Sequence, residues 1–236
     1  MRKILLIAAT SLFLAATVKA QKEKSETIEG NGRTVTKEIP VSSFESLKAS
    51  GVYELKLSQG NAESVKIEAD ENLQQYFTVR TEGKQLVIDM KEVKNKNMKL
   101  KNKLKVYVTF KELKEMDLSM VGNVQTDALK FSDLEINNNS VGHVDLNLSA
   151  NTVSVKNNSV GQMKLAGKAQ NAVVKHNGVG SLQAGDFVVQ TMNIDNSGVG
   201  GAEVNASKEL KVSDNMLGKV KNKGTAPVKK NNKVVI

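Results

Sequence analysis

The sequence has no cysteine and no tryptophan, and its 236 residues include only two histidines and two prolines. Without cysteine the chain cannot form disulfides, zinc–thiolate sites or iron–sulfur clusters, and it has no thiolate nucleophile. A chain of this length can bury a sufficient core without such cross-links. Aromatic residues make up only 4% of the chain, so the stacking platforms of nucleic-acid binders are scarce. These absences exclude a disulfide-stapled scaffold and argue against a nucleic-acid partner.

The first twenty residues have the pattern of a secretory signal peptide. Arg2 and Lys3 precede an apolar stretch, 4–18, and small Ala20 ends the segment. The stretch is shorter than the roughly 20 residues of a membrane span, and no later segment qualifies; an uncleaved anchor is the alternative. Export without disulfides suits a bacterial periplasm, cell surface or secreted location, and we expect no transmembrane segment after signal cleavage.

The positive charge of the chain is concentrated in two lysine-rich segments. The formal charge of +9 becomes +6 when Arg2, Lys3 and Lys19 are removed with the signal. Residues 91–105 hold seven lysines and residues 219–233 hold six. These lysines alternate with Asn, Val and Leu, as expected of solvated strand edges, although attraction to an anionic polysaccharide or membrane surface is an alternative. The candidate contact surface in the first segment comprises Lys96, Lys99, Lys101, Lys103 and Lys105.

A short repeat dominates the region from about residue 111 to 223. Six segments share a Val-Gly or Leu-Gly step, and their glycines are spaced by 20, 19, 19, 20 and 18 residues. These glycines are Gly122, Gly142, Gly161, Gly180, Gly200 and Gly218. Apolar residues alternate on both sides of each glycine, as in Val153/Val155 and Met163/Leu165, which indicates two half-buried strands per repeat. Two strands and two corners in about 19 residues predict an all-β fold, a parallel β-helix or solenoid.

A column of short polar residues lies three positions before the glycines. Its members are Ser119, Asn139, Asn158, Asn177, Ser197 and Asn215. Stacked rungs put these residues above one another, where Asn side chains can bond to each other and to the corner backbone. We interpret the column as a structural corner; a ligand-binding stripe is the alternative.

The N-terminal half is expected to cap the solenoid with antiparallel strands. Turn signals at 59–61 and 82–84 separate alternating segments as in hairpins, and residues 50–53 resemble a first, degenerate rung. The predicted division is a signal peptide at 1–20, a linker at 21–34, an N-terminal β region with a hairpin excursion at 35–110, and the solenoid with its C-terminal cap at 111–236. Pro227 and a strand at 234–236 are expected to close the stack.

No catalytic, cofactor or metal constellation stands out. The acids of the repeats do not recur at one position, and the nearest approach to a carboxylate pair is Asp195 with Asp214. His143 and His176 occupy different positions relative to their glycines, so we predict no metal pair and no cofactor.

The chain resembles the auto-transporter adhesin head domain family, also called the GIN domain, known from secreted proteins of Bacteroidetes. The resemblance runs from Phe44 and the 50–52 segment through 59–60, 86–89 and 104–110 into the Val-Gly repeats. It implies a signal peptide, a β-helical body and adhesion, with no catalytic residues to carry over. The Asn-rich corners depart from the Gly-Ser-Gly corners usual in the family.

Three functions remain open on the sequence. The leading hypothesis is a non-enzymatic envelope or cell-surface protein whose solenoid contacts a glycan or an envelope protein through many weak, regularly spaced interactions. The second is a polysaccharide-modifying β-helix enzyme, in which Asp195 and Asp214 would converge with a lysine. The third is a structural or assembly protein of the envelope.

Overall fold

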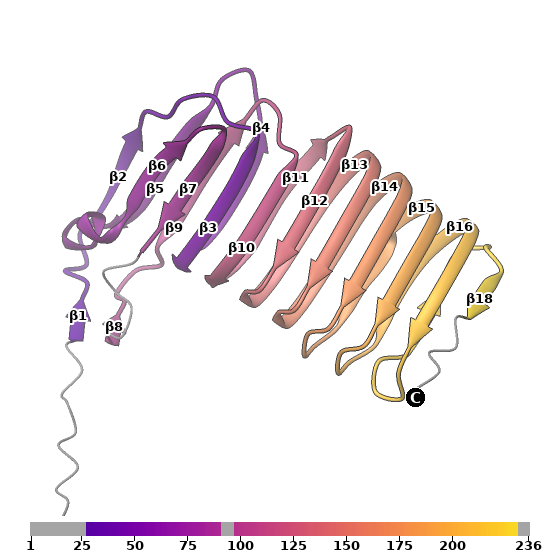
Figure 1. Ribbon diagram of the computed structural model, residues 1–236. Helices are drawn as coiled ribbons and strands as arrows, with labels where there is room; N and C mark the ends of the chain where they lie inside the picture. Colours follow the sequence, from indigo (N-terminus) through magenta and orange to yellow (C-terminus); the bar gives the residue numbers. More distant parts are fainter. Residues whose placement is uncertain (1–26, 91–96, 231–236) are drawn as a thin grey trace, which may run out of the picture.

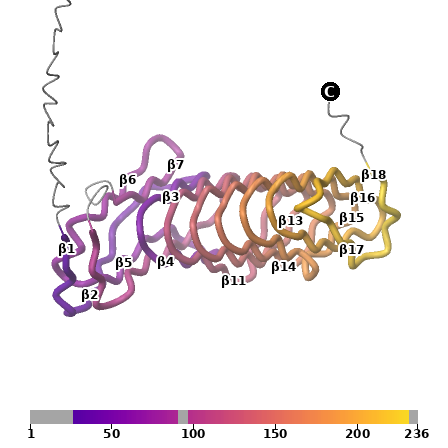
Figure 2. Tube along the Cα trace, turned by 90° about the horizontal axis from the view of Figure 1, so that it is seen from below, coloured from indigo at the N-terminus to yellow at the C-terminus, as the bar shows by residue number. Residues whose placement is uncertain are grey.

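The protein is a parallel β-solenoid closed at its N-terminal end by antiparallel strands (Figure 1). The computed structural model describes residues 27–90 and 97–230. The signal segment, Lys96 and the strand expected at 234–236 therefore lie outside the described residues. The body winds through about six turns along one axis, as the view from below shows (Figure 2). The predicted fold class is confirmed.

Two faces run along the solenoid, and each long strand contributes to both. The strands of the body are β10 (Glu115–Val121), β11 (Val124–Lys130), β12 (Asp133–Asn138), β13 (Val141–Asn157), β14 (Val160–His176), β15 (Leu182–Asn196), β16 (Ala202–Asp214), β17 (Val220–Asn222) and β18 (Val228–Lys230). The first half of β13 pairs with β11 and its second half with β12. The long strands β14, β15 and β16 continue both halves of β13. Face I is the side formed by β10, β12, β18 and the second halves of β13 to β16. Face II is the side formed by β11, β17 and the first halves of β13 to β16.

The first rung is formed by β3 (Ser46–Val52) and β4 (Glu54–Gln59), which pair in parallel with β10 and β11. Val52 aligns with Val121, and Tyr53 follows at the position where later rungs carry glycine. The degenerate rung predicted at residues 50–53 is therefore present.

The cap contains the strands that precede the repeats. They are β2 (Thr34–Ile39), β5 (Ser64–Asp70), the 3₁₀ helix η1 (Glu71–Tyr76), β6 (Thr78–Glu82), β7 (Gln85–Asp89) and β9 (Lys105–Phe110). The hairpin expected at Gly83 joins β6 and β7. The hairpin expected at Gly60 is wrong, because β9 pairs with both β4 and β5 and separates them. In the segment expected to be a linker, β1 (Thr27–Glu29) pairs in parallel with β8 (Asn97–Lys99).

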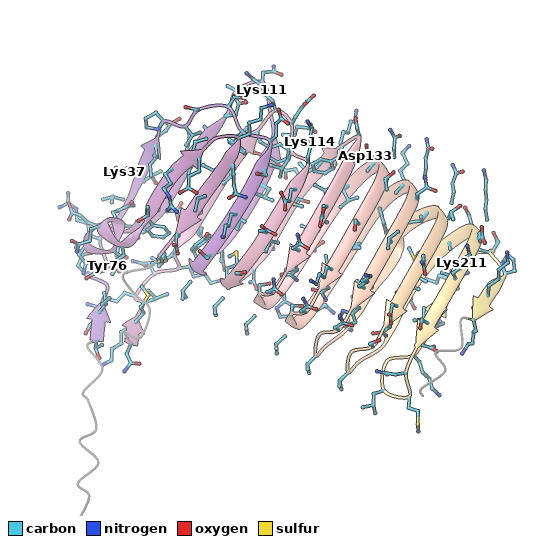
Figure 3. All side chains as sticks on the ribbon, viewed as in Figure 1. Lys37, Tyr76, Lys111, Lys114, Asp133 and Lys211 are labelled. Atoms are coloured by element: carbon cyan, nitrogen blue, oxygen red, sulfur yellow. The ribbon has the colours of Figure 1, made fainter. Side chains whose placement is uncertain are left out.

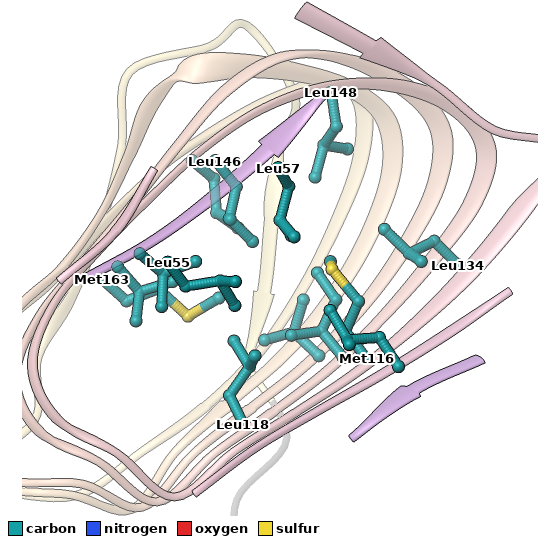
Figure 4. Packing of buried hydrophobic residues seen from close by; sticks show 14 of the residues in the cluster. Leu55, Leu57, Met116, Leu118, Leu134, Leu146, Leu148 and Met163 are labelled. Carbon is teal, nitrogen blue, oxygen red and sulfur yellow. The ribbon is translucent and has the colours of Figure 1, made fainter. Parts of the chain in front are cut away.

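The core consists of apolar columns along the axis (Figure 4). On face II, Leu55, Val124, Val144, Met163, Leu182 and Ala202 occupy successive rungs in register. All six side chains are buried. Alternation of side chains places every second residue inside, so the apolar pairs of the repeat form a continuous core. Burial of stacked columns is the main force that holds the rungs together.

One corner of each rung is formed by the repeated glycine. From Gly122 to Gly200 these glycines have positive φ, and a Cβ on Gly161 would lie 2.1 Å from the carbonyl oxygen of Gly142. Only glycine accepts both this backbone angle and this close approach. Gly218 lies in the same column but does not have a positive φ, so the corner loses its regular geometry at the last rung. We call this edge the glycine corner.

Candidate contact surfaces of the solenoid

The predicted polar column lies exposed along the glycine corner. The Asn158 amide donates to Asn139 Oδ1 at 3.0 Å, and the Asn177 amide donates to Asn158 Oδ1 at 3.4 Å. Asn215 Oδ1 accepts a hydrogen bond from the backbone N–H of Leu217. The Asn215 amide donates to the carbonyl of Ser197 at 2.7 Å. The column therefore bonds to itself and to the corner backbone, as a structural element does.

A second polar column, one residue earlier, is fully buried and was not recognised in the sequence. It consists of Asn138, Asn157, His176 and Asn196, each with 0% exposure. Asn138 Nδ2 donates to Asn157 Oδ1 at 2.7 Å, and Asn196 Nδ2 donates to the carbonyl of Gly218 at 2.7 Å. We call this the inner ladder. Its signal was an Asn or His four residues before four of the six repeat glycines, those from Gly142 to Gly200. The inner ladder links neighbouring rungs through bonds shielded from water.

His176 is the one ionisable member of the inner ladder's four residues. Its Nδ1 lies 2.7 Å from Asn157 Nδ2, and its Nε2 lies 3.3 Å from the carbonyl of Gly180. An amide nitrogen can only donate, so Nδ1 must accept and Nε2 must carry the proton. Burial lowers the pKa of His176. The ring is therefore held neutral as a structural link rather than as a base open to substrate.

An exposed aliphatic ridge follows the glycine corner over six rungs. Val121, Val141, Val160, Val179 and Val199 precede the glycines and are 48–53% exposed. Leu217 extends the row, and consecutive valines align in register. We call this row the valine ridge. Aligned apolar residues exposed in this way mark an interaction surface more often than scattered ones do.

Face II carries adjoining shallow depressions along the axis. Two of them, of about 580 and 470 Å³, share Lys164 in their linings. Register places the outward side chains in one column: Lys56, Gln125, Asp145, Lys164, Gln183, Glu203 and Lys221. We call this column with its depressions the axial groove. It offers hydrogen-bond donors and acceptors at the spacing of the rungs, about 4.8 Å.

Another depression, of about 700 Å³, lies on the opposite corner beside the cap. Its margin includes Lys111, Lys114 and Asp133, which Figure 3 labels. Phe131 lines it and stacks on Phe110 with ring centroids 6.0 Å apart. This depression covers only the first rungs and has no repeat along the axis.

Among the described lysines of the first segment, three of four are paired with carboxylates. Lys105 lies 2.7 Å from Glu68, Lys103 lies 2.6 Å from Glu54, and Lys101 lies 3.5 Å from Glu29. Hydrogen bonding to Glu68 raises the pKa of Lys105. Lys99 lies in β8, while Lys96 falls outside the described residues. The positive charges of Lys101, Lys103 and Lys105 are thus balanced within the chain.

The acids and histidines considered for chemistry do not converge. Asp195 aligns with Ser213, whereas Asp214 aligns with Asn196, so the two carboxylates belong to adjacent positions whose side chains point to opposite faces of the sheet. Asp214 lies 3.6 Å from Lys230. His143 is exposed on face II, and His176 belongs to the inner ladder. Within residues 27–90 and 97–230, no three His, Asp or Glu side chains are grouped so that they could hold a metal ion.

No helix in the described part of the chain is long and apolar enough to cross a membrane. The 3₁₀ helix η1 spans six residues. The fold and its surfaces thus define a capped parallel β-solenoid with long, repetitive contact faces.

The chain belongs to the family described as putative auto-transporter adhesin, head GIN domain, which matches residues 43–226. The family resemblance stated from the sequence is therefore confirmed. The match covers the first rung, the excursion and all the glycine corners.

Several solved structures have a similar fold. A putative adhesin from Bacteroides fragilis has a TM-score of 0.74 at 22% identity and covers 86% of this chain and 100% of its own. A putative lipid binding protein from Parabacteroides distasonis has a TM-score of 0.63 at 22% identity, over 87% of this chain and 95% of its own. A putative adhesin from Parabacteroides merdae reaches 0.54 at 21% identity, over 88% and 95%. No curated protein matches the chain. At these identities the likeness establishes the fold.

Proposed function

We propose that this protein is an exported, non-enzymatic adhesive module that binds an extended glycan along the axial groove of face II. Membership of an adhesin family and a signal-like N-terminus support the exported, adhesive role. The axial groove is the observation that carries the choice of surface. A polysaccharide-modifying enzyme of the kind considered from the sequence would bring Asp195 and Asp214 together. The strand register instead places them at adjacent positions on opposite faces of the sheet.

The axial groove suits an extended polysaccharide for two physical reasons. Its side chains repeat at about 4.8 Å, close to the rise of one sugar ring in an extended β-linked chain, so successive sugars meet equivalent positions. Its column mixes ammonium, amide and carboxylate groups, which match the donors and acceptors of sugar hydroxyls. Each contact is weak, and many in a row add up.

The positive positions of the groove are regularly spaced. Lys56, Lys164 and Lys221 are separated by three rungs each, with Asp145 and Glu203 among the positions between them. Lys221 lies 3.8 Å from Glu203, and Lys223 lies 3.4 Å from the same carboxylate. Both neutral and acidic glycans can therefore be accommodated, the latter with their carboxylates at the lysine positions.

A glycan array with the mature protein tests this proposal. The double variant Asp145→Asn with Lys164→Gln keeps side-chain size while removing the central charges, and we expect it to weaken glycan binding about tenfold, or about 1.4 kcal/mol. The matched control is Glu135→Gln with Lys156→Gln on face I, which should bind as the wild type does. Absence of binding to every glycan, or equal loss in both double variants, would contradict the proposal. Release of reducing sugar from a bound glycan would show an enzyme instead.

A further inference from the structure

The valine ridge points to a partner that the axial groove does not explain. We infer that this ridge is the contact between two copies of the protein, which meet ridge to ridge with their solenoid axes antiparallel. The ridge lies on the glycine corner and the axial groove lies on face II. The flank of the ridge nearer face II shares Ser181, Gly201 and Lys219 with one depression of the axial groove, but the inference rests on the ridge and does not require glycan binding.

The strip around the valine ridge contains no Lys, Arg, Asp or Glu side chain over five rungs. On one side it is flanked by the exposed polar column, Ser119, Asn139, Asn158, Asn177 and Ser197. On the other side, two residues after each ridge position, lie Asn123, His143, Gln162, Ser181 and Gly201. A quarter of the chain is charged, and its net charge is +6 once Arg2, Lys3 and Lys19 are removed with the signal. Two copies therefore repel each other, and this strip carries none of the repelling lysines.

The repeat of the ridge favours a second solenoid over other partners. Ridge residues lie about 4.8 Å apart, so five intervals from Val121 to Leu217 span about 24 Å. An extended peptide laid along the ridge would place its same-face side chains roughly 6.6 Å apart, a spacing that does not match the roughly 4.8 Å between ridge residues. A second copy has the same repeat along its whole length. An anionic membrane would instead select lysines beside the apolar row, and the flanks here are neutral.

Charge at the two ends favours the antiparallel arrangement. The neutral flank continues into Glu54 at the first rung and Lys219 at the last. A two-fold axis perpendicular to the ridge at Val160 brings Glu54 of each copy opposite Lys219 of the other. Glu54 also lies 2.6 Å from Lys103 of its own chain. A parallel arrangement would place the two C-terminal ends side by side. Lys219, Lys221 and Lys223 of one copy would then repel the same lysines of the other.

The contact is expected to be weak. The strip is three side chains wide and curves around a corner, so it buries less than the roughly 800 Å² per partner of a stable interface. Val160 contacts its own counterpart at the two-fold axis, which makes the interface self-complementary. Copies displayed on facing surfaces would add many such contacts, and multivalency then gives firm attachment.

Sedimentation equilibrium of the mature protein over a range of concentrations tests this inference. We expect a reversible monomer–dimer equilibrium for the wild type, and at least tenfold weaker association for Val160→Lys and for Val160→Glu, since each sets like charges against each other. An equimolar mixture of the two variants should recover association, because Lys then faces Glu. Val173→Lys, at an exposed valine of face I, is the control and should dimerise normally. Circular dichroism melting checks that each variant is folded.

Two results would overturn the inference. One is a wild type that stays monomeric at every concentration, or a mixture of charge variants that associates no better than either alone. The other comes from vesicles of phosphatidylcholine. If the monomeric wild type sediments with the vesicles and Val160→Lys does not, the ridge serves a lipid surface and the dimer is wrong.

Discussion

Asn157 and His176, nineteen residues apart, are joined by a 2.7 Å contact between Asn157 Nδ2 and His176 Nδ1 inside the solenoid. The oxygen of the same Asn157 side chain accepts from Asn138 Nδ2 at 2.7 Å and from the Ser159 hydroxyl at 2.9 Å. The Asn157 side chain therefore bonds to three neighbouring side chains, those of Asn138, Ser159 and His176. The imidazole can receive the Asn157 amide only in its neutral form.

Acid is expected to destabilise the protein through His176. Burial lowers the pKa of the folded-state imidazole from its ordinary value of 6.5, so the unfolded chain binds the proton more readily. The stabilisation is fully present above about pH 6.5 and is lost as the pH falls from there toward the folded pKa. Thermal melting between pH 8 and pH 5 should show a falling midpoint.

The matched variant for this prediction is His176→Asn, because asparagine occupies the same column at Asn138, Asn157 and Asn196. It should keep the inner ladder and lose the part of the pH dependence due to His176. If wild type and variant show the same change of midpoint between pH 8 and pH 5, His176 is not the responsible group.

The two adjacent asparagine columns are predicted to differ in energetic importance. Asn157→Ala removes the partner of Asn138, Ser159 and His176 in a buried site, and buried polar groups left unpaired cost about 1–3 kcal/mol each. We expect a loss of about 2–4 kcal/mol in the free energy of unfolding. Asn158→Ala, in the exposed column, should cost less than about 1 kcal/mol, since its bonds compete with water. Urea unfolding followed by circular dichroism measures both, and equal losses would contradict the assignment.

A side chain at the glycine corner is expected to disrupt the stacking of rungs. Gly161 has φ of 131°, and an added Cβ would lie 2.1 Å from the Gly142 carbonyl oxygen. Gly161→Ala should therefore cost about 3 kcal/mol or more, from backbone strain and the forced separation of rungs. Gly83→Ala is the control: φ is 60° and no atom lies within 4 Å of the added Cβ, so about 1–2 kcal/mol is expected. A similar fall in melting temperature for both variants would rule out the steric account.

Lys105 is predicted to lower the pKa of the Glu68 carboxyl group in the cap. Its ammonium, 2.7 Å from Glu68 Oε1, holds the pKa of that carboxyl below its ordinary value of 4.5. Lys105→Gln should raise the pKa of Glu68, and the stability that this ion pair contributes above that pKa is lost as pH falls. NMR titration of the Glu68 carboxyl carbon measures the change. Lys99→Gln should leave this titration unchanged, and an unaltered Glu68 in Lys105→Gln would refute the coupling.

The solenoid could be predicted because its determinants are local and repeated. The glycine spacing and the alternating pairs such as Val153 and Val155 need only the preferences of a few neighbouring residues. A period of about 19 residues then forces equivalent positions to stack, so the exposed column at Asn139, Asn158 and Asn177 also followed from the sequence alone. The same reasoning located the first rung at residues 50–53.

The tertiary structure decided which residues meet across long separations. The insertion of β9 between β4 and β5 pairs Lys105 with Glu68 and removes the hairpin expected at Gly60. No local preference distinguishes this order from a simple hairpin, because both bury the same alternating residues. Burial of Asn157 and His176 likewise depends on the side of the chain that turns inward at the corner. The sequence by itself determined that rungs stack, and only the packing of the whole chain decided which polar side chains they enclose.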